Sequence, residues 1–133
     1  MRALEYAMSL AQESNSTLIV LHVIEPFPLR HAEGETVLSD FTLLKDYIAA
    51  AEEEGRALLA KAIPDAVRSY CQVETVQAVG KPYREILRLA ATEASDLIVL
   101  GVHGRNPVDL LFFGSTAQHV VRGAACPVLT IRT

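Results

Sequence analysis

Short apolar runs alternate along the chain with segments of helical periodicity. Unbroken or alternating apolar stretches, which are typical of β-strands, occupy residues 17–24, 71–76, 97–100 and 127–131. Apolar residues at helical spacing occupy residues 2–14, 41–63 and 82–95, and a further segment that opens at residue 114. Parallel strands need crossover connections, and these are usually helices. The pattern therefore predicts an α/β fold, a Rossmann-like parallel sheet with helices on both faces.

The apolar runs differ in a way that indicates their places in the sheet. Residues 17–24 and 97–100 are mostly Leu, Ile and Val, as in strands that are covered on both faces. Residues 71–76 largely alternate between apolar and polar, which indicates an edge or half-exposed strand. His22 lies inside the first run, and we expect it to be a hydrogen-bonded core residue.

Glycines and hydroxyl residues follow the run at 97–100 in an order that suits an anion. Gly101 and Gly104 come just after the strand, and Gly114-Ser115-Thr116 opens the next helix after nine intervening residues. Open α/β sheets bind ligands beyond the carboxyl ends of their strands, and glycine lets the backbone approach closely. A helix start adds unpaired N–H groups. The spacing suggests a site for a phosphate-bearing ligand, although a tight turn and an ordinary helix cap explain the same residues.

The same segment resembles the universal stress protein family. Gly101-x2-Gly104-x9-Gly114-Ser115 matches the nucleotide-binding signature of that family, and the resemblance extends over nearly the whole chain. It implies a five-stranded parallel sheet in the order 3-2-1-4-5, with ATP between strands 1 and 4 and Mg²⁺ accompanying the ATP. The residues that it implies for nucleotide contact are Val23, Leu100, Gly101, His103, Gly104, Arg105, Gly114, Ser115, Thr116 and Ala117. Val23 and Leu100 would flank the adenine, and Arg105 is the best candidate cation for the phosphates.

The resemblance departs from the family at the amino end. The family begins with a strand of the kind ILVPVDGS, whose aspartate helps to hold the adenine, and this sequence starts after it. The strand that is missing would be the central one, between residues 17–24 and 97–100. Either these two flanking strands pair directly, or a segment of a partner chain fills the gap, or the sequence is a truncation of a longer protein. We expect the nucleotide affinity to be lower than in an intact member.

Length, charge and cysteine content narrow the class of protein. The 133 residues suit one domain, which we expect to cover 1–133, and the formal net charge of −4 argues against a nucleic-acid binder. No apolar run approaches the roughly 20 residues that span a bilayer, and the amino end does not resemble a signal peptide, so we expect a cytoplasmic protein without membrane contact. Cys71 and Cys126 lie far apart without metal-type spacing, and we expect both to be reduced.

Other catalytic chemistry finds little support. Gly80-Lys81 lacks the spacing of a P-loop, and no HExxH motif or Cys/His cluster indicates a metal site, so we expect no catalytic residue and no metal ligand. Ser115 and His119 stand four residues apart and could meet as nucleophile and base on one helix face. A surface histidine beside a helix cap is the interpretation that we prefer.

The resemblance implies an ATP-binding regulatory module of the stress response. No residue resembles a dedicated general base for the γ-phosphate, so hydrolysis is expected to be slow at most. The resemblance also implies a homodimer through Val128–Arg132, an exposed β-prone terminal strand. Two alternatives stay open, a dimeric interaction module of the same fold without nucleotide and a slow ATP hydrolase.

Overall fold

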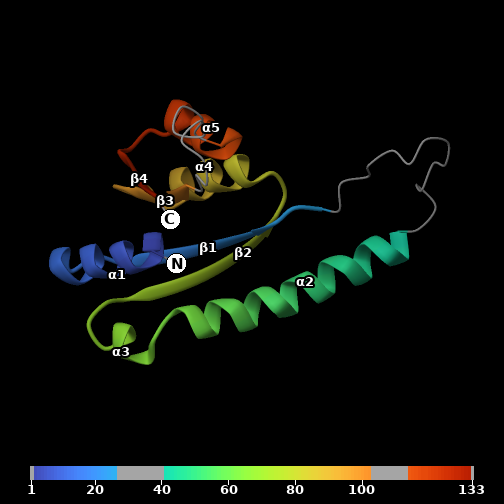
Figure 1. The fold of residues 1–133 in the computed structure, drawn as a ribbon, viewed down its shortest axis with the longest axis horizontal. Helices are drawn as coiled ribbons and strands as arrows, with labels where there is room; N and C mark the ends of the chain where they lie inside the picture. The colour runs from blue at the N-terminus through green and yellow to red at the C-terminus, as the bar shows by residue number, and fades with distance from the viewer. Residues whose placement is uncertain (1, 27–40, 103–113, 133) are drawn as a thin grey trace.

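The computed structural model describes residues 2–26, 41–102 and 114–132. In chain order the elements are α1 (Arg2–Ser14), β1 (Leu18–Ile24), α2 (Phe41–Ala62), α3 (Asp65–Arg68), β2 (Val73–Val79), α4 (Pro82–Thr92), β3 (Ile98–Val102), α5 (Ser115–Gly123) and β4 (Val128–Arg132) (Figure 1). The predicted alternation of helices and strands is confirmed, and the short helix α3 is added to it. Three of the predicted nucleotide contacts, His103, Gly104 and Arg105, lie outside the described residues.

Local sequence signals explain where several elements begin and end. Pro82 occupies the first turn of α4, where the N–H that proline lacks would have no helical partner. The first helix ends before Asn15, which takes a left-handed φ of 50°, a conformation that asparagine tolerates better than most residues. Pro64 precedes α3 in an extended conformation, which separates that helix from α2.

The strands form two separate parallel pairs. β1 pairs with β2 in a register that runs from Leu18 opposite Val73 to the carboxyl ends of both strands. β3 pairs with β4, with Ile98 opposite Val128. Among the described residues no ladder joins β1 to β3, so the described strands form two two-stranded sheets. The α/β class is therefore confirmed, and direct pairing of the two flanking strands is excluded as the way in which the gap closes.

Two helices connect the strand pairs. Helix α1 contacts β1 in one pair and both β3 and β4 in the other, and α4 contacts β1 and α5 (Figure 1). One buried cluster joins α1 to the segment around α3; its members are Ala11, Ile63, Val67 and Cys71, with Met8, Leu18, Val20 and Val73 packed against it. Another part of the interior lies under α5, where Val120 is fully buried. The two strand pairs are therefore held together by side-chain packing. No backbone ladder between the described strands joins them.

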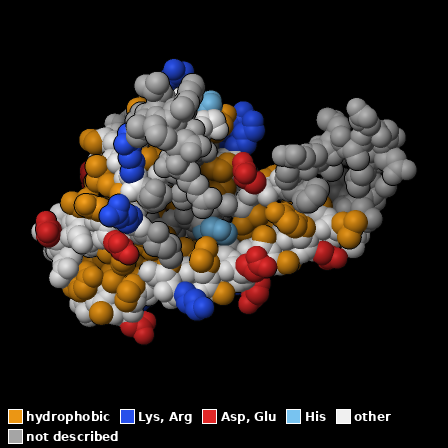
Figure 2. Space-filling model, in the orientation of Figure 1, with side chains coloured by type: hydrophobic (Ala, Val, Ile, Leu, Met, Phe, Trp, Pro, Cys, Tyr) orange, Lys and Arg blue, Asp and Glu red, His pale blue; other side chains and the backbone are white. Residues whose placement is uncertain are grey.

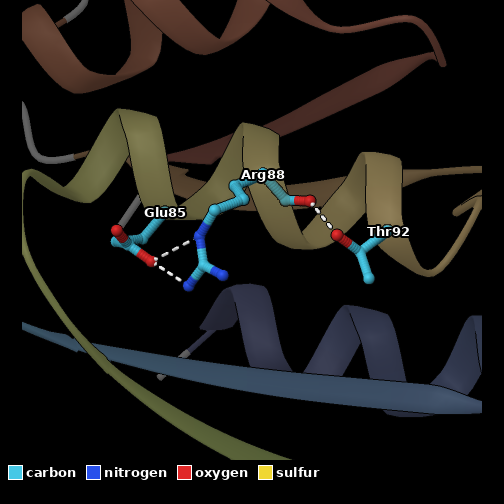
Figure 3. A network of polar contacts seen from close by, with 3 residues as sticks. All are labelled: Glu85, Arg88 and Thr92. Carbon is cyan, nitrogen blue, oxygen red and sulfur yellow. Dashed lines mark hydrogen bonds and ion pairs between the residues drawn. The ribbon is translucent and has the colours of Figure 1, made fainter.

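The exposed surface of α4 carries a local ion pair. Arg88 donates from Nε to Glu85 Oε2 at 3.1 Å and makes a second contact to the same oxygen from Nη2 (Figure 3). Thr92 Oγ1 donates to the carbonyl oxygen of Arg88 at 2.9 Å. The Arg88 side chain is 67% exposed and the Glu85 side chain 16% exposed, so the pair lies at the surface with its carboxylate partly covered. Figure 2 shows acidic side chains along the region of α2, in agreement with a solvated outer face.

Candidate functional site

The start of α5 offers backbone donors to a ligand. Gly114 is the N-cap residue, with φ −50° and ψ 156°, and no side chain caps the helix. Gln118 N–H makes the first bond of the helix, to Gly114 O at 3.1 Å. The N–H groups of Ser115, Thr116 and Ala117 come before that bond, so they have no acceptor within the helix. Such groups form a site where an anion is favoured.

Side chains around this helix start are arranged to leave it open. Gly114 and Ser115 are exposed and Thr116 is half-buried. A Cβ atom built at Gly114 would meet nothing within 4 Å. Ala117 is only 3% exposed because its methyl group faces the core, so its contribution to a ligand is limited to its backbone. Of the motif residues on this helix, Gly114 and Ser115 are therefore exposed, whereas Ala117 is buried.

The remaining described members of the predicted site lie at strand ends. Val23 is half-buried one residue before the end of β1, and Leu100 and Gly101 stand near the end of β3. Gly101 is exposed and Leu100 is half-buried. Among the described strands, β1 pairs with β2 and β3 pairs with β4. The residues predicted to flank an adenine thus lie on β1 and β3, in different strand pairs.

His119 is held as a structural side chain. Its Nδ1 lies 2.6 Å from the backbone carbonyl oxygen of Ser115, and its ring stacks on Tyr83 with centroids 4.3 Å apart and an interplanar angle of 22°. A carbonyl oxygen only accepts hydrogen bonds, so Nδ1 carries a proton and donates it. In this geometry Nδ1 bonds the carbonyl group of Ser115 and not its hydroxyl group, and the surface-histidine interpretation stays a prediction.

The structure also shows a cavity that the sequence analysis missed. It has a volume of about 440 Å³ and lies between the carboxyl end of β1 and the inner face of α2, bordered by Pro82 at the start of α4. Its lining includes Val23 and His22 from the strand and Gly55 and Leu58 from the helix. A second cavity has a volume of about 450 Å³, and none of the predicted site residues lines it. Its lining residues are Arg56, Leu59, Ala60, Arg68, Thr75 and Gln77. Gly55, a glycine in the middle of a long helix, is the sequence signal for a close approach of α2 to the strands beside the first cavity.

Gly55 leaves room for two polar side chains. A Cβ atom at this position would lie 2.4 Å from Gln77 Oε1 and 2.6 Å from His22 Nδ1. Both of those atoms are buried without a hydrogen-bond partner, whereas Gln77 Nε2 donates to Glu52 O at 3.1 Å. The expectation that His22 is a hydrogen-bonded core residue is therefore wrong for Nδ1, because the neighbouring α2 backbone offers no free group at Gly55.

Charged and metal-binding chemistry is sparse in the described parts of the chain. On the exposed side of α2, Arg56 Nη2 donates a hydrogen bond to Glu53 Oε2 at 2.6 Å. This hydrogen bond raises the pKa of Arg56 above its usual value. Within residues 2–26, 41–102 and 114–132, no three His, Cys, Asp or Glu residues are grouped so that they could hold a metal ion. No described helix is long and apolar enough to cross a bilayer. Both cysteines are free, with Cys71 buried and Cys126 half-buried.

Comparison with known proteins identifies the family. Residues 1–132 match the sequence model of the universal stress protein family. A universal stress protein of Thermus aquaticus is 34% identical over 98% of this chain and 88% of its own length. Among solved structures, the universal stress protein UspA from Lactobacillus plantarum is 26% identical and covers 98% of this chain and 88% of its own, with a TM-score of 0.78. A universal stress protein in complex with cAMP shares the fold, with 23% identity, a TM-score of 0.58, and coverage of 99% of this chain and 86% of its own. This chain belongs to the universal stress protein family.

Proposed function

We propose that this chain is an ATP-binding regulatory module of the stress response. The observation that carries the proposal is the start of α5, where three N–H groups lack acceptors in the helix and no side chain caps them. The hydroxyl groups of Ser115 and Thr116 add two polar groups on the same turn. Together these groups form a set of donors that suits the oxygens of a phosphate chain.

The strand ends supply residues that suit an adenosine moiety. Gly101 is exposed at the end of β3, where the absence of a side chain lets a ligand approach the backbone. Val23 and Leu100 supply apolar side chains at the ends of β1 and β3, which suit the faces of a purine ring. Mg²⁺ would enter with the triphosphate and neutralise part of its charge.

The proposed role is binding and not rapid hydrolysis. His119, the histidine that the structure describes on α5, has its Nδ1 proton engaged by the Ser115 carbonyl oxygen and its ring stacked on Tyr83. A general base must lie within hydrogen-bond reach of the attacking water and accept its proton. We expect any hydrolysis to be slow, and a phosphate-release assay on the ATP-loaded protein tests this directly.

Titration calorimetry with Mg-ATP tests the proposal, with Gly114→Ala as the decisive variant. The new methyl group enters space that is open in the structure, so we expect the fold to be unchanged. A phosphate seated on that backbone would collide with the methyl group, and the affinity for ATP should fall by about tenfold, or about 1.4 kcal/mol. Adenosine should be affected less, and cAMP serves as a second ligand. Wild-type protein that does not bind ATP, or a variant that binds it equally well, contradicts the proposal.

A dimeric interaction module without nucleotide is the second candidate, and the break between β1 and β3 favours it. The two strands that would hold the adenine belong to separate sheets, so no shared ladder fixes their spacing. The outer edge of β4 offers a route to dimerisation. Ile98 N–H donates to Pro127 O, so Pro127 directs its backbone groups toward β3. Successive residues of a strand alternate in this direction, and Thr130 lies three residues further on, so its N–H and C=O groups point away from β3. A second copy of β4 could pair with that edge.

A further inference from the structure

One edge of β2 carries backbone groups that the β1–β2 ladder does not use. Leu18 N–H donates to Gln72 O at 2.8 Å, and Gly80 N–H donates to Ile24 O at 3.0 Å. In a parallel ladder the N–H and C=O of one residue point to the same side, and successive residues alternate. The even-numbered residues of β1 and β2 therefore bond each other. The odd-numbered residues of β2 direct their backbone groups away from β1.

Arg68 gives independent evidence for this direction. It ends α3, and its Nη1 donates a long hydrogen bond to Val73 O at 3.5 Å. The carbonyl group of Val73 therefore points away from β1, as the alternation requires. The N–H and C=O groups of Thr75, Gln77 and Val79 follow on the same side, and no described strand pairs with them. We call the backbone groups of these last three residues the outer edge of β2.

The second cavity lies beside this outer edge. Its volume is about 450 Å³, and α2, α3 and β2 all contribute to its lining. The side chains of Thr75 and Gln77 line it on the strand side, and Gln77 Nε2 donates to Glu52 O of α2, so these side chains face α2. Alternate side chains of a strand share one face of the sheet. A strand added to the outer edge would therefore direct every second side chain toward this cavity.

The charged side chains that the structure describes in the cavity lining are two arginines. Arg56 belongs to α2 and Arg68 to α3, and both are exposed. Arg56 is paired with Glu53, which does not line the cavity. The two side chains of that pair are 61% and 76% exposed, so the pair is held weakly and can exchange for another carboxylate. In a chain of formal net charge −4, this cavity is a local site that favours acidic side chains.

We propose that the outer edge of β2 docks an extended segment of another polypeptide that carries glutamate or aspartate at alternate positions. Its backbone would extend the β1–β2 pair by one strand, and its carboxylates would lie beside Arg56 and Arg68. Its opposite face would be uncharged, because Glu74 is exposed on that face of β2. A second copy docked edge to edge would bring like charges together, which disfavours it. The inference depends neither on nucleotide binding nor on the gap between β1 and β3.

The test uses the synthetic peptide Ser-Thr-Val-Glu-Val-Glu-Val-Thr-Ser and residue-resolved amide hydrogen exchange on the whole chain. Saturation with the peptide should slow exchange of the Thr75 and Gln77 amides by about tenfold or more. The Val76 and Ala78 amides should change little, because they already lie in the ladder to β1. Absence of binding, or slowing that leaves Thr75 and Gln77 unchanged, overturns the proposal.

Charge variants test the role of the two arginines. The same peptide with glutamine in place of both glutamates should bind about fivefold more weakly at low salt, since each exposed ion pair contributes modestly. The double variant Arg56→Gln with Arg68→Gln should lose the same factor toward the glutamate peptide alone. Arg122→Gln, at an exposed arginine of α5, is the matched control and should bind both peptides as the wild type does. Equal affinity of the wild type for the two peptides refutes the acidic occupant.

Backbone methylation separates strand pairing from charge attraction. One version of the glutamate peptide carries N-methyl groups on its three valines and another on its two glutamates, so each loses the donors of one edge. At least one version should bind at least tenfold more weakly, and unchanged binding of both contradicts strand addition. Light scattering tests for a second copy. A chain that is already dimeric, with Thr75 and Gln77 protected before any peptide is added, would assign the outer edge to that copy and refute the external segment.

Discussion

Replacement of Gly55 by alanine should destabilise the protein, although the same change in a helix normally stabilises. Alanine is preferred over glycine in a helix interior by about 0.5 to 1 kcal/mol. Here the new Cβ atom would lie 2.4 Å from Gln77 Oε1, 2.6 Å from His22 Nδ1 and 2.9 Å from His22 Cε1. Contacts this short cannot persist, so α2 and β1 must separate or both side chains must move.

The magnitude follows from the two opposing terms. Overpacking of an interior costs about 1 to 3 kcal/mol, and here it meets two polar atoms that are already buried without partners. After subtraction of the helix preference of about 0.5 to 1 kcal/mol, we expect Gly55→Ala to lower the free energy of unfolding by about 0 to 2.5 kcal/mol, with a central value of about 1 kcal/mol. For a chain of 133 residues this central value corresponds to a fall in Tm of about 4 °C.

Thermal and urea unfolding followed by circular dichroism measure the effect. Gly123→Ala is the matched control, because its Cβ would meet only Leu87 at short range, with Cδ1 at 2.7 Å, whereas the Cβ at Gly55 would meet two atoms of the His22 ring as well as the end of the Gln77 side chain. We expect that variant to stay within about 0.5 kcal/mol of the wild type. In the double variant Gly55→Ala with Gln77→Ala, removal of the amide should recover about 1 kcal/mol as a coupling energy. A rise in Tm for Gly55→Ala alone would refute the packing argument.

Three further outcomes follow from the sequence and the ladders. Arg105→Ala should weaken ATP by about tenfold and adenosine much less, since a charge-assisted bond to phosphate contributes about 1.5 to 3 kcal/mol; equal losses in calorimetry argue against phosphate contact. Thr130→Pro removes an N–H that faces away from β3, so it should raise the dimer dissociation constant in light scattering by at least about tenfold with Tm little changed. Val20→Pro removes a bond to β2 and should cost about 3 kcal/mol in urea unfolding, whereas Ile19→Pro should cost clearly less, and equal costs would contradict the assigned ladder.

Most of the fold could be predicted because it depends on local pattern. The apolar runs and the helical periods gave the order of elements, and their ends agree with the structure to within about three residues. α3 was missed because the four residues Asp65–Arg68 are too short to show a helical period. The separation of the strands into two pairs lay beyond local pattern, because it depends on whether residues far apart in the chain pair with each other.

In the candidate site, the part with a contiguous sequence signal was predicted, and the part built from distant residues was missed. The helix start at Gly114 was predicted because its signal is contiguous: a glycine followed by two hydroxyl residues. The cavity beside β1 was missed because His22, Gly55 and Gln77 are distant in sequence and meet only when the crossover places α2 on the strands. An unpartnered imidazole nitrogen also has no signature in sequence, since its partners are decided by packing.

The two strand pairs have a consequence for how the molecule opens. Backbone cooperativity passes along a continuous sheet from strand to strand, and among the described residues it stops between β1 and β3. The β3–β4 ladder can therefore melt while the longer β1–β2 ladder stays intact, with only the contacts of α1 and α4 to couple the two events. We therefore expect two foldons of unequal stability, with the half that carries the five-residue ladder and α5 opening first.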